Sequence, residues 1–170
     1  MTSSRDTMAH LFSCFDTMYL VLGEGAPTLT NDAYVIRTYE MARAFGEVAL
    51  RFREHLVDVE TEPLAPLEDV LRRAISLDTT GAMVLFAMAT VIGPRVLVSL
   101  RDARETGDLD EPEFGIAVLA SQVLIQEIRA VGEVAGQQAP IDDPKWQSDA
   151  QSLSADLDMG GNAESFGISR

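Results

Sequence analysis

Along most of the chain, apolar side chains recur with the spacing of a helix that has one buried side. The first such segment spans 2–22. A second follows Thr30 and Asn31, which are both good helix caps. Its apolar stripe is formed by Met41, Phe45, Val48, Phe52 and Leu56. A further helix is expected to start near Pro66, and the last one to run from Asp110 to about Gly136. These patterns predict helices joined by short breaks.

The segment 79–100 differs because it is apolar on every side. No charge occurs from Thr79 to Pro94. A helix that is apolar all round must be buried in a protein core, an oligomer core or lipid. The uncharged part would be about 24 Å long as a helix, shorter than the ~30 Å hydrocarbon core of a bilayer. We therefore favour a core helix over a shared oligomer core or membrane-contacting chamber, and both over a true span. Pro94 should kink the helix or begin a new segment.

The predicted fold is all-α, with about four helices in antiparallel hairpins and one fully apolar helix in an oligomer or domain core. We expect a helical domain over 1–136 and a flexible, disordered acidic tail over 137–170, where Pro, Ser, Gln and Asp accumulate. The few large apolar side chains of this tail are Trp146, Leu153 and Leu157. They would share one side of a short helix that forms on docking. An unbound tail is the alternative.

Composition narrows the classes of partner and of compartment. Hydrophobic residues make up 46% and aromatic residues 6%, so the core should be aliphatic and helical. The formal net charge of −14 disfavours nucleic acid, whose phosphates would be repelled. Cys14 is the single cysteine, which excludes an internal disulfide and fits a reducing compartment. Since no secretory signal is evident, we expect a cytoplasmic protein, with peripheral contact at the inner face of the cell membrane as a further option.

No motif in the sequence carries chemistry. The histidines, His10 and His55, do not complete the Glu-x-x-His pairs of a di-iron bundle. Phosphate-binding and nucleophile-elbow motifs are absent. Cys14 has no base beside it in the sequence, so we expect it to be a small buried hydrophobe. The carboxylates are distributed as helix caps and outer faces. We therefore expect no catalytic residues, no cofactor and no metal, unless the fold assembles a site that spacing does not reveal.

In overall character the chain resembles one known family. It is short, acidic, arginine-biased and poor in histidine, and it has one apolar helix, GAMVLFAMATVIGPRVLVSL. In these respects it resembles the small helical scaffold, or stalk, subunit of actinobacterial high-affinity hydrogen-uptake hydrogenases. The resemblance implies an oligomeric stalk that tethers catalytic subunits, leads quinone to them from the membrane and binds no metal itself.

The favoured hypothesis is a non-catalytic scaffold subunit that forms homo-oligomers through the apolar helix and tethers a larger complex, such as a redox complex. The residues expected to meet other copies, or to line an apolar chamber for a lipophilic molecule such as quinone, are Met83, Val84, Phe86, Ala87, Val91 and Ile92. The alternative is a soluble monomeric four-helix domain that binds a ligand or regulates. In that case the same chain would cover all sides of Val84, Leu85, Phe86 and Val91. A metal-binding or enzymatic bundle is a third hypothesis.

Overall fold

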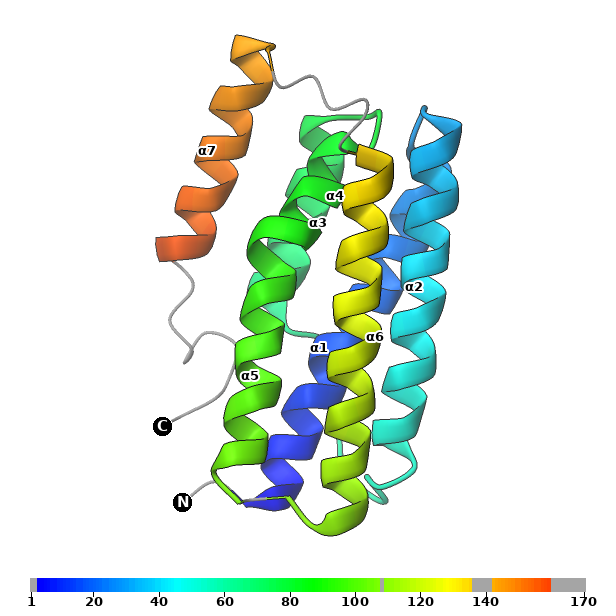
Figure 1. Cartoon of the computed structure of the whole chain (residues 1–170), viewed down its shortest axis with the longest axis vertical. Helices are drawn as coiled ribbons and strands as arrows, with labels where there is room; N and C mark the ends of the chain where they lie inside the picture. Colours follow the sequence, from blue (N-terminus) through cyan, green and yellow to red (C-terminus); the bar gives the residue numbers. More distant parts are fainter. Residues whose placement is uncertain (1–2, 108, 136–141, 160–170) are drawn as a thin grey trace.

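The computed structural model describes residues 3–107, 109–135 and 142–159, and its regular structure there is helical (Figure 1). In chain order the elements are α1 (Ser4–Gly25), η1 (Ala26–Thr28), α2 (Asp32–Arg53), α3 (Ala65–Leu77), α4 (Ala82–Ala87), η2 (Met88–Ile92), α5 (Gly93–Glu105), α6 (Glu111–Ala135) and α7 (Pro144–Met159). Because α4, η2 and α5 follow one another directly, they form one continuous helix over 82–105. The all-α prediction is confirmed, although the described residues contain more helices than the four expected.

The bundle is built from α1, α2, α6 and the continuous helix 82–105. Helix α2 packs against α1 and α6, α6 packs against α5, and α5 contacts α1. In Figure 1, α6 lies in front, between α5 and α2. Helix α3 covers α1 and α4 from outside this bundle. The continuous helix therefore has neighbours on several sides within the chain.

The helix starts are set by local side chains, as the sequence indicates. Ser3 caps α1 by accepting a hydrogen bond from the backbone N–H of Asp6, whose carboxylate accepts from the N–H of Ser3 in return. Asn31 caps α2 by accepting from the N–H of Tyr34 at 3.2 Å. The turn before α4 requires glycine at position 81, because its φ is +101°. These caps confirm the predicted starts of the first two helices to within two residues.

The centre of the bundle is an apolar core with few aromatic rings. Phe15 of α1 packs against Phe45 and Phe52 of α2 with ring centroids 5.7 and 5.9 Å apart. Aliphatic and methionine side chains fill most of the rest, including Leu11 and Met41. Burial of this apolar surface, at roughly 25 cal/mol per Å², is the main stabilising contribution to the fold.

Pro94 changes the helical geometry, as its sequence position predicts. Proline has no N–H to donate to the carbonyl four residues earlier and its ring crowds that carbonyl. The residues just before it, Met88–Ile92, adopt π-helical geometry, and the N–H of Gly93 donates to the carbonyl of Met88. The helix thus continues through the proline by widening one turn, so the expected kink takes the form of a π-bulge.

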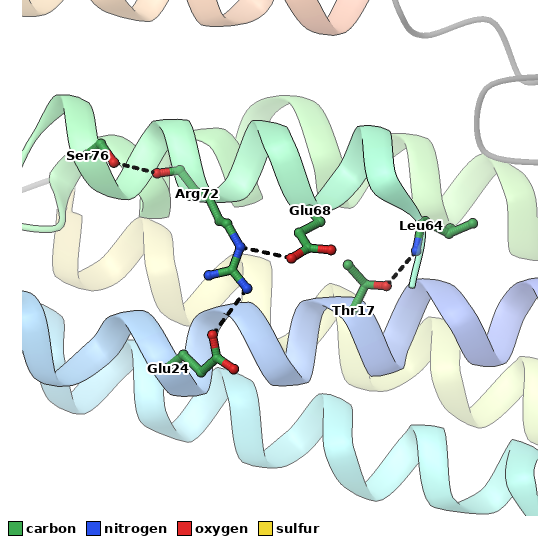
Figure 2. A network of polar contacts seen from close by, with 6 residues as sticks. All are labelled: Thr17, Glu24, Leu64, Glu68, Arg72 and Ser76. Atoms are coloured by element: carbon green, nitrogen blue, oxygen red, sulfur yellow. Dashed lines mark hydrogen bonds and ion pairs between the residues drawn. The ribbon is translucent and has the colours of Figure 1, made fainter. Parts of the chain in front are cut away.

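A polar network joins α3 to α1 (Figure 2). The guanidinium of Arg72 donates to Glu68 on its own helix at 2.9 Å and to Glu24 of α1 at 3.1 Å. At the other end of α3, the hydroxyl oxygen of Thr17 accepts from the N–H of Leu64 at 3.0 Å, which satisfies a donor at the start of the helix. This network fixes the carboxylate of Glu24 at the edge of α1.

Part of the predicted flexible tail is helical. Helix α7 packs against α3 and α4, and its Ala150 and Leu153 are buried. Of the two expectations for the tail, Pro144–Met159 follows the short helix rather than the unbound segment. The physical reason is that α4 presents an apolar surface to which this helix can dock within the same chain. Residues 136–141 and 160–170 lie outside the described part.

Candidate functional site

The residues predicted to line an oligomer core or apolar chamber fall into two groups. Met83, Val84, Ala87 and Ile92 are fully buried within the single chain. They offer no surface to a second copy in this conformation, so their role in an oligomer core or apolar chamber stays a prediction. Phe86 and Val91 are half-buried. The neighbours α3, α6 and α7, which the sequence pattern does not place, provide the cover.

The tail residues dock on the chain itself. The Trp146 ring packs edge-on against Phe86, with centroids 5.3 Å apart, and its indole N–H donates to Asp78 at 3.2 Å. Leu153 is fully buried. The side chain of Leu157 lies outside the described part of the structure. These residues therefore contact the α3–α4 corner of the same chain, and docking of the tail on a partner stays a prediction.

Among the described residues, one thiol lies beside an imidazole, but this thiol is not activated as a nucleophile. The Sγ of Cys14 lies 3.5 Å from Nε2 of His10 on the next turn of α1. Burial raises the pKa of the Cys14 thiol to about 12 and lowers the pKa of His10 to about 4. Both groups are therefore neutral near pH 7, whereas a nucleophilic cysteine needs its thiolate. The full burial of Cys14 agrees with its predicted role as a small hydrophobe.

Metal ligands do not converge in the described part of the chain. No group of three or more His, Cys, Asp or Glu side chains there is placed to hold a metal ion. A largely buried ion pair joins Arg37 of α2 to Glu127 of α6, and both side chains are less than 15% exposed. Desolvation raises the pKa of Glu127, and the charge of Arg37 opposes that shift. This pair clamps two helices together.

An open groove with a volume of about 840 Å³ lies between α1 and α2. Its floor consists of small residues: Gly23, Ala42, Gly46 and Ala49. Its walls carry Phe12, Tyr19, Leu20, Tyr39 and Leu50. Four of these wall residues, all but Phe12, are more than 40% exposed. We call this feature the α1–α2 groove.

A second, smaller groove of about 450 Å³ adjoins the first. It lies between α2 and α6 and is lined in part by Val48, Leu50, Leu119 and Val123. Leu50 lines both grooves and is 61% exposed. Together the exposed members form a band across three helices, which we call the apolar belt: Tyr19, Leu20, Tyr39, Leu50 and Leu119.

Sequence reasoning missed the apolar belt because it concentrated on residues within the helical stripes. Helical spacing places Tyr19 in the inner stripe of the first helix, but its ring lies over Gly46 at the groove and is 42% exposed. A signal for the others exists in the sequence. Tyr39 and Leu50 are large and apolar, yet they lie off the stripe that runs from Met41 to Leu56. Such residues mark an outer apolar face on an otherwise charged helix.

Two helices in the described residues are long and apolar enough to cross a membrane by length and composition alone. They span Ala82–Glu105 and Glu111–Val134. Comparisons with models of protein families, with curated proteins and with solved structures found no match.

Proposed function

We propose that this chain is a non-catalytic helical scaffold subunit that binds protein partners, including copies of itself, through the apolar belt. The observation that supports this most is the exposure of large apolar side chains along the open grooves between α1, α2 and α6. Exposed large apolar side chains gathered along a groove are typical of protein interaction sites. Tyrosine and leucine on a rigid helical bundle can be buried by a partner with little loss of conformational entropy.

The chemistry of the polar groups supports a role without catalysis. The buried pair His10 and Cys14 is neutral, and the largely buried pair Arg37 and Glu127 joins two helices of the bundle. A catalytic site would instead bring polar groups together in a pocket with shifted pKa values matched to a reaction. The lining of the α1–α2 groove consists mainly of apolar and small residues.

This proposal moves the binding surface from the predicted apolar helix to the apolar belt, because the chain covers most of that helix itself. The scaffold would hold copies of the chain together and tether a larger complex. A hydrogenase as the tethered complex, a quinone as the enclosed molecule and peripheral contact with the membrane remain predictions from the sequence.

The test compares one substitution in the belt with a matched one outside it. Leu50→Asp places a charge where both grooves meet, and Val98→Asp places the same charge on the exposed side of α5. Sedimentation equilibrium over a range of concentrations should show that the wild type self-associates. Leu50→Asp should weaken the association by at least about tenfold, a difference of ~1.4 kcal/mol, while Val98→Asp leaves it unchanged. Equal association of all three proteins, or a wild type that is monomeric and recovers no partner from its native source, would contradict the proposal.

A second candidate function is that of a monomeric domain that binds a small apolar ligand. It is favoured because the chain itself buries most of its apolar helix. Val84 and Leu85 are fully buried, as this alternative requires, whereas Phe86 and Val91 are only half-buried. The α1–α2 groove has the volume of a small-molecule site, although such sites usually enclose most of the ligand. Titration with an environment-sensitive apolar dye tests this candidate. Binding to a protein that stays monomeric, abolished by Leu50→Asp, would favour it over the scaffold.

A further inference from the structure

The two edges of the α1–α2 groove carry mostly opposite charges. Helix α1 contributes the carboxylates of Asp16 and Glu24 to the lining, and α2 contributes the guanidinium groups of Arg43 and Arg53. Within the chain, Glu24 accepts a hydrogen bond from Arg72 of α3 at 3.1 Å, and the Arg53 guanidinium lies over the Phe12 ring of α1. Glu47 also lies on the α2 edge, where it accepts a hydrogen bond from Arg43 at 3.2 Å. Between these edges lie the exposed apolar side chains of the groove. A partner for this surface must offer an apolar centre with basic groups toward α1 and acidic groups toward α2.

Two contacts between α1 and α2 show which residues of the two helices lie at the same level, that is, the same position along the helix axes. The guanidinium carbon of Arg53 lies 5.6 Å from the ring centroid of Phe12, and a Cβ on Gly46 would meet the Tyr19 ring. Each contact joins α1 to α2. The number of residues between the two contacts is the same on both helices, as expected for antiparallel helices packed side by side. At 1.5 Å per residue, Glu24 and Arg43 therefore differ in level by only about 3 Å, and Asp16 and Arg53 by about 6 Å.

We propose that the α1–α2 groove binds the same groove of a second copy, about a two-fold axis parallel to the helices. This inference rests on the proposed function and names the partner of that surface. In this arrangement α1 of each copy lies on α2 of the other, at the same level along the axis. Glu24 then faces Arg43 of the second copy, and Asp16 faces Arg53 of the second copy. By symmetry each pair occurs twice.

The remaining groups fit the same arrangement. Glu47 lies at nearly the level of Tyr19 of the second copy, whose phenol can donate a hydrogen bond to it. The exposed apolar side chains of both copies meet at the axis, where Gly46 and its neighbouring alanines keep the floor low. The groove lining extends from Tyr39 to Arg53 on α2, about 21 Å of helix, so the contact continues over roughly four turns.

The charges select this axis over the one perpendicular to the helices. The perpendicular axis would place α1 on α1 and α2 on α2. Asp16 would then approach Glu24 of the second copy, and Arg43 would approach Arg53 of the second copy. Like charges placed against each other across an interface are strongly unfavourable. The parallel axis pairs opposite charges instead.

The experiment uses charge reversal in the full-length chain. Glu24→Arg alone places two guanidinium groups against each other across the interface, and Arg43→Glu alone places two carboxylates against each other, twice in each dimer. Each single variant should weaken dimerisation by at least about tenfold in sedimentation equilibrium. An equimolar mixture of the two variants allows a heterodimer in which one of the two contacts pairs the reversed charges and the other keeps the native pair. It should associate with an affinity near that of the wild type, and so should the double variant Glu24→Arg/Arg43→Glu.

The controls separate this pairing from folding and from the proposed function. Arg101→Glu and Glu105→Arg make the same charge changes on α5, outside the groove, and should leave dimerisation unchanged. Recovery in the mixture cannot come from variants that fail to fold. If the wild type self-associates but neither Glu24→Arg nor Arg43→Glu weakens it, this pairing is overturned and the scaffold proposal stands. If the single variants weaken association and the mixture does not recover it, the parallel axis is wrong. If the wild type is monomeric throughout, the second copy is excluded as the occupant.

Discussion

Two apolar helices of equal length differ in how much of their surface the rest of the chain covers. Helices 82–105 and 111–134 are both long and apolar enough to cross a membrane. In the most apolar window of each, 56% of the residues are buried in the first helix and only 28% in the second. The difference shows that apolar composition sets how much surface a helix must hide, while its neighbours decide whether the chain hides that surface.

The neighbours differ in number. The continuous helix 82–105 packs against α6 through its length, against α3 and α7 at its start and against α1 further on. Helix α6 packs mainly against α2 and the 82–105 helix, and its outer side faces away from the bundle (Figure 1). Phe114, Leu119 and Ile125 on α6 are each at least 40% exposed. Exposed apolar surface is therefore available to another molecule on α6 as well as in the α1–α2 groove.

The sharpest test of this comparison makes the same change in both helices. Leu85 of α4 is fully buried and Leu119 of α6 is 43% exposed. Leu85→Ala removes buried methyl groups and leaves a cavity, which should lower the free energy of unfolding by about 3 kcal/mol. Leu119→Ala should lower it by less than about 1 kcal/mol. Urea unfolding of both variants at low protein concentration measures the two values. Equal losses would mean that α6 is as well covered as α4.

Much of the fold is predictable from local signals. The caps at Ser3 and Asn31 give the helix starts, the 3.6-residue stripes give the inner faces of α1 and α2, and Pro94 marks the altered turn in the apolar helix. Each signal acts through contacts a few residues apart in the sequence. For that reason one sequence is sufficient to find it.

The candidate site is less predictable because it depends on which surfaces remain uncovered. The sequence makes 82–105 the most apolar segment, so that segment is the natural candidate for an oligomer core. Its cover by α7 depends on contacts such as Trp146 with Phe86 and Asp78, which join positions more than fifty residues apart. No local pattern reveals such pairing. The exposure of Leu50 likewise follows from the absence of a neighbour.

Although one side of α6 is exposed, a polar contact with α2 helps to hold this helix in place. The Arg37–Glu127 ion pair joins α2 to α6 in a largely buried position. Arg37→Met leaves Glu127 without its partner and should lower the free energy of unfolding by about 2 kcal/mol at pH 7. Glu127→Gln keeps a hydrogen-bond acceptor and removes the charge, so it should cost less than about 1 kcal/mol.

The pH dependence provides a second measurement on the same pair. Desolvation raises the folded-state pKa of Glu127 above its ordinary value, with Arg37 acting against this shift. Its contribution to stability is therefore fully present below the unfolded-state pKa and is lost as pH rises through the folded-state pKa. Arg37→Met should steepen that loss in urea unfolding curves between acid and neutral pH, and Glu127→Gln should abolish it. Identical pH profiles for the two variants would exclude this cause.

The smallest expected changes in stability come from replacing a glycine in each of the two helices. These two substitutions also compare the helices most simply. A Cβ on Gly93 would lie 2.5 Å from the carbonyl oxygen of Met88 and from the Ile128 side chain, whereas a Cβ on Gly115 of α6 meets nothing within 4 Å. Gly93→Ala should therefore destabilise the fold by at least about 1 kcal/mol. Gly115→Ala should stabilise it by roughly 0.5–1 kcal/mol, because alanine restricts the unfolded chain and favours the helix.

Thermal unfolding at two protein concentrations completes this last test. In dilute solution opposite signs are expected for the two glycine variants, and equal signs would show that the two helices are packed alike. If Gly115→Ala stabilises the dilute protein but destabilises the concentrated one, another copy must approach α6 closely at Gly115. That outcome would place a second contact between copies beside the α1–α2 groove, since only a backbone or side chain from outside the described chain can occupy the space around Gly115. A stabilising effect at both concentrations would leave that part of α6 facing water in the assembled protein as well.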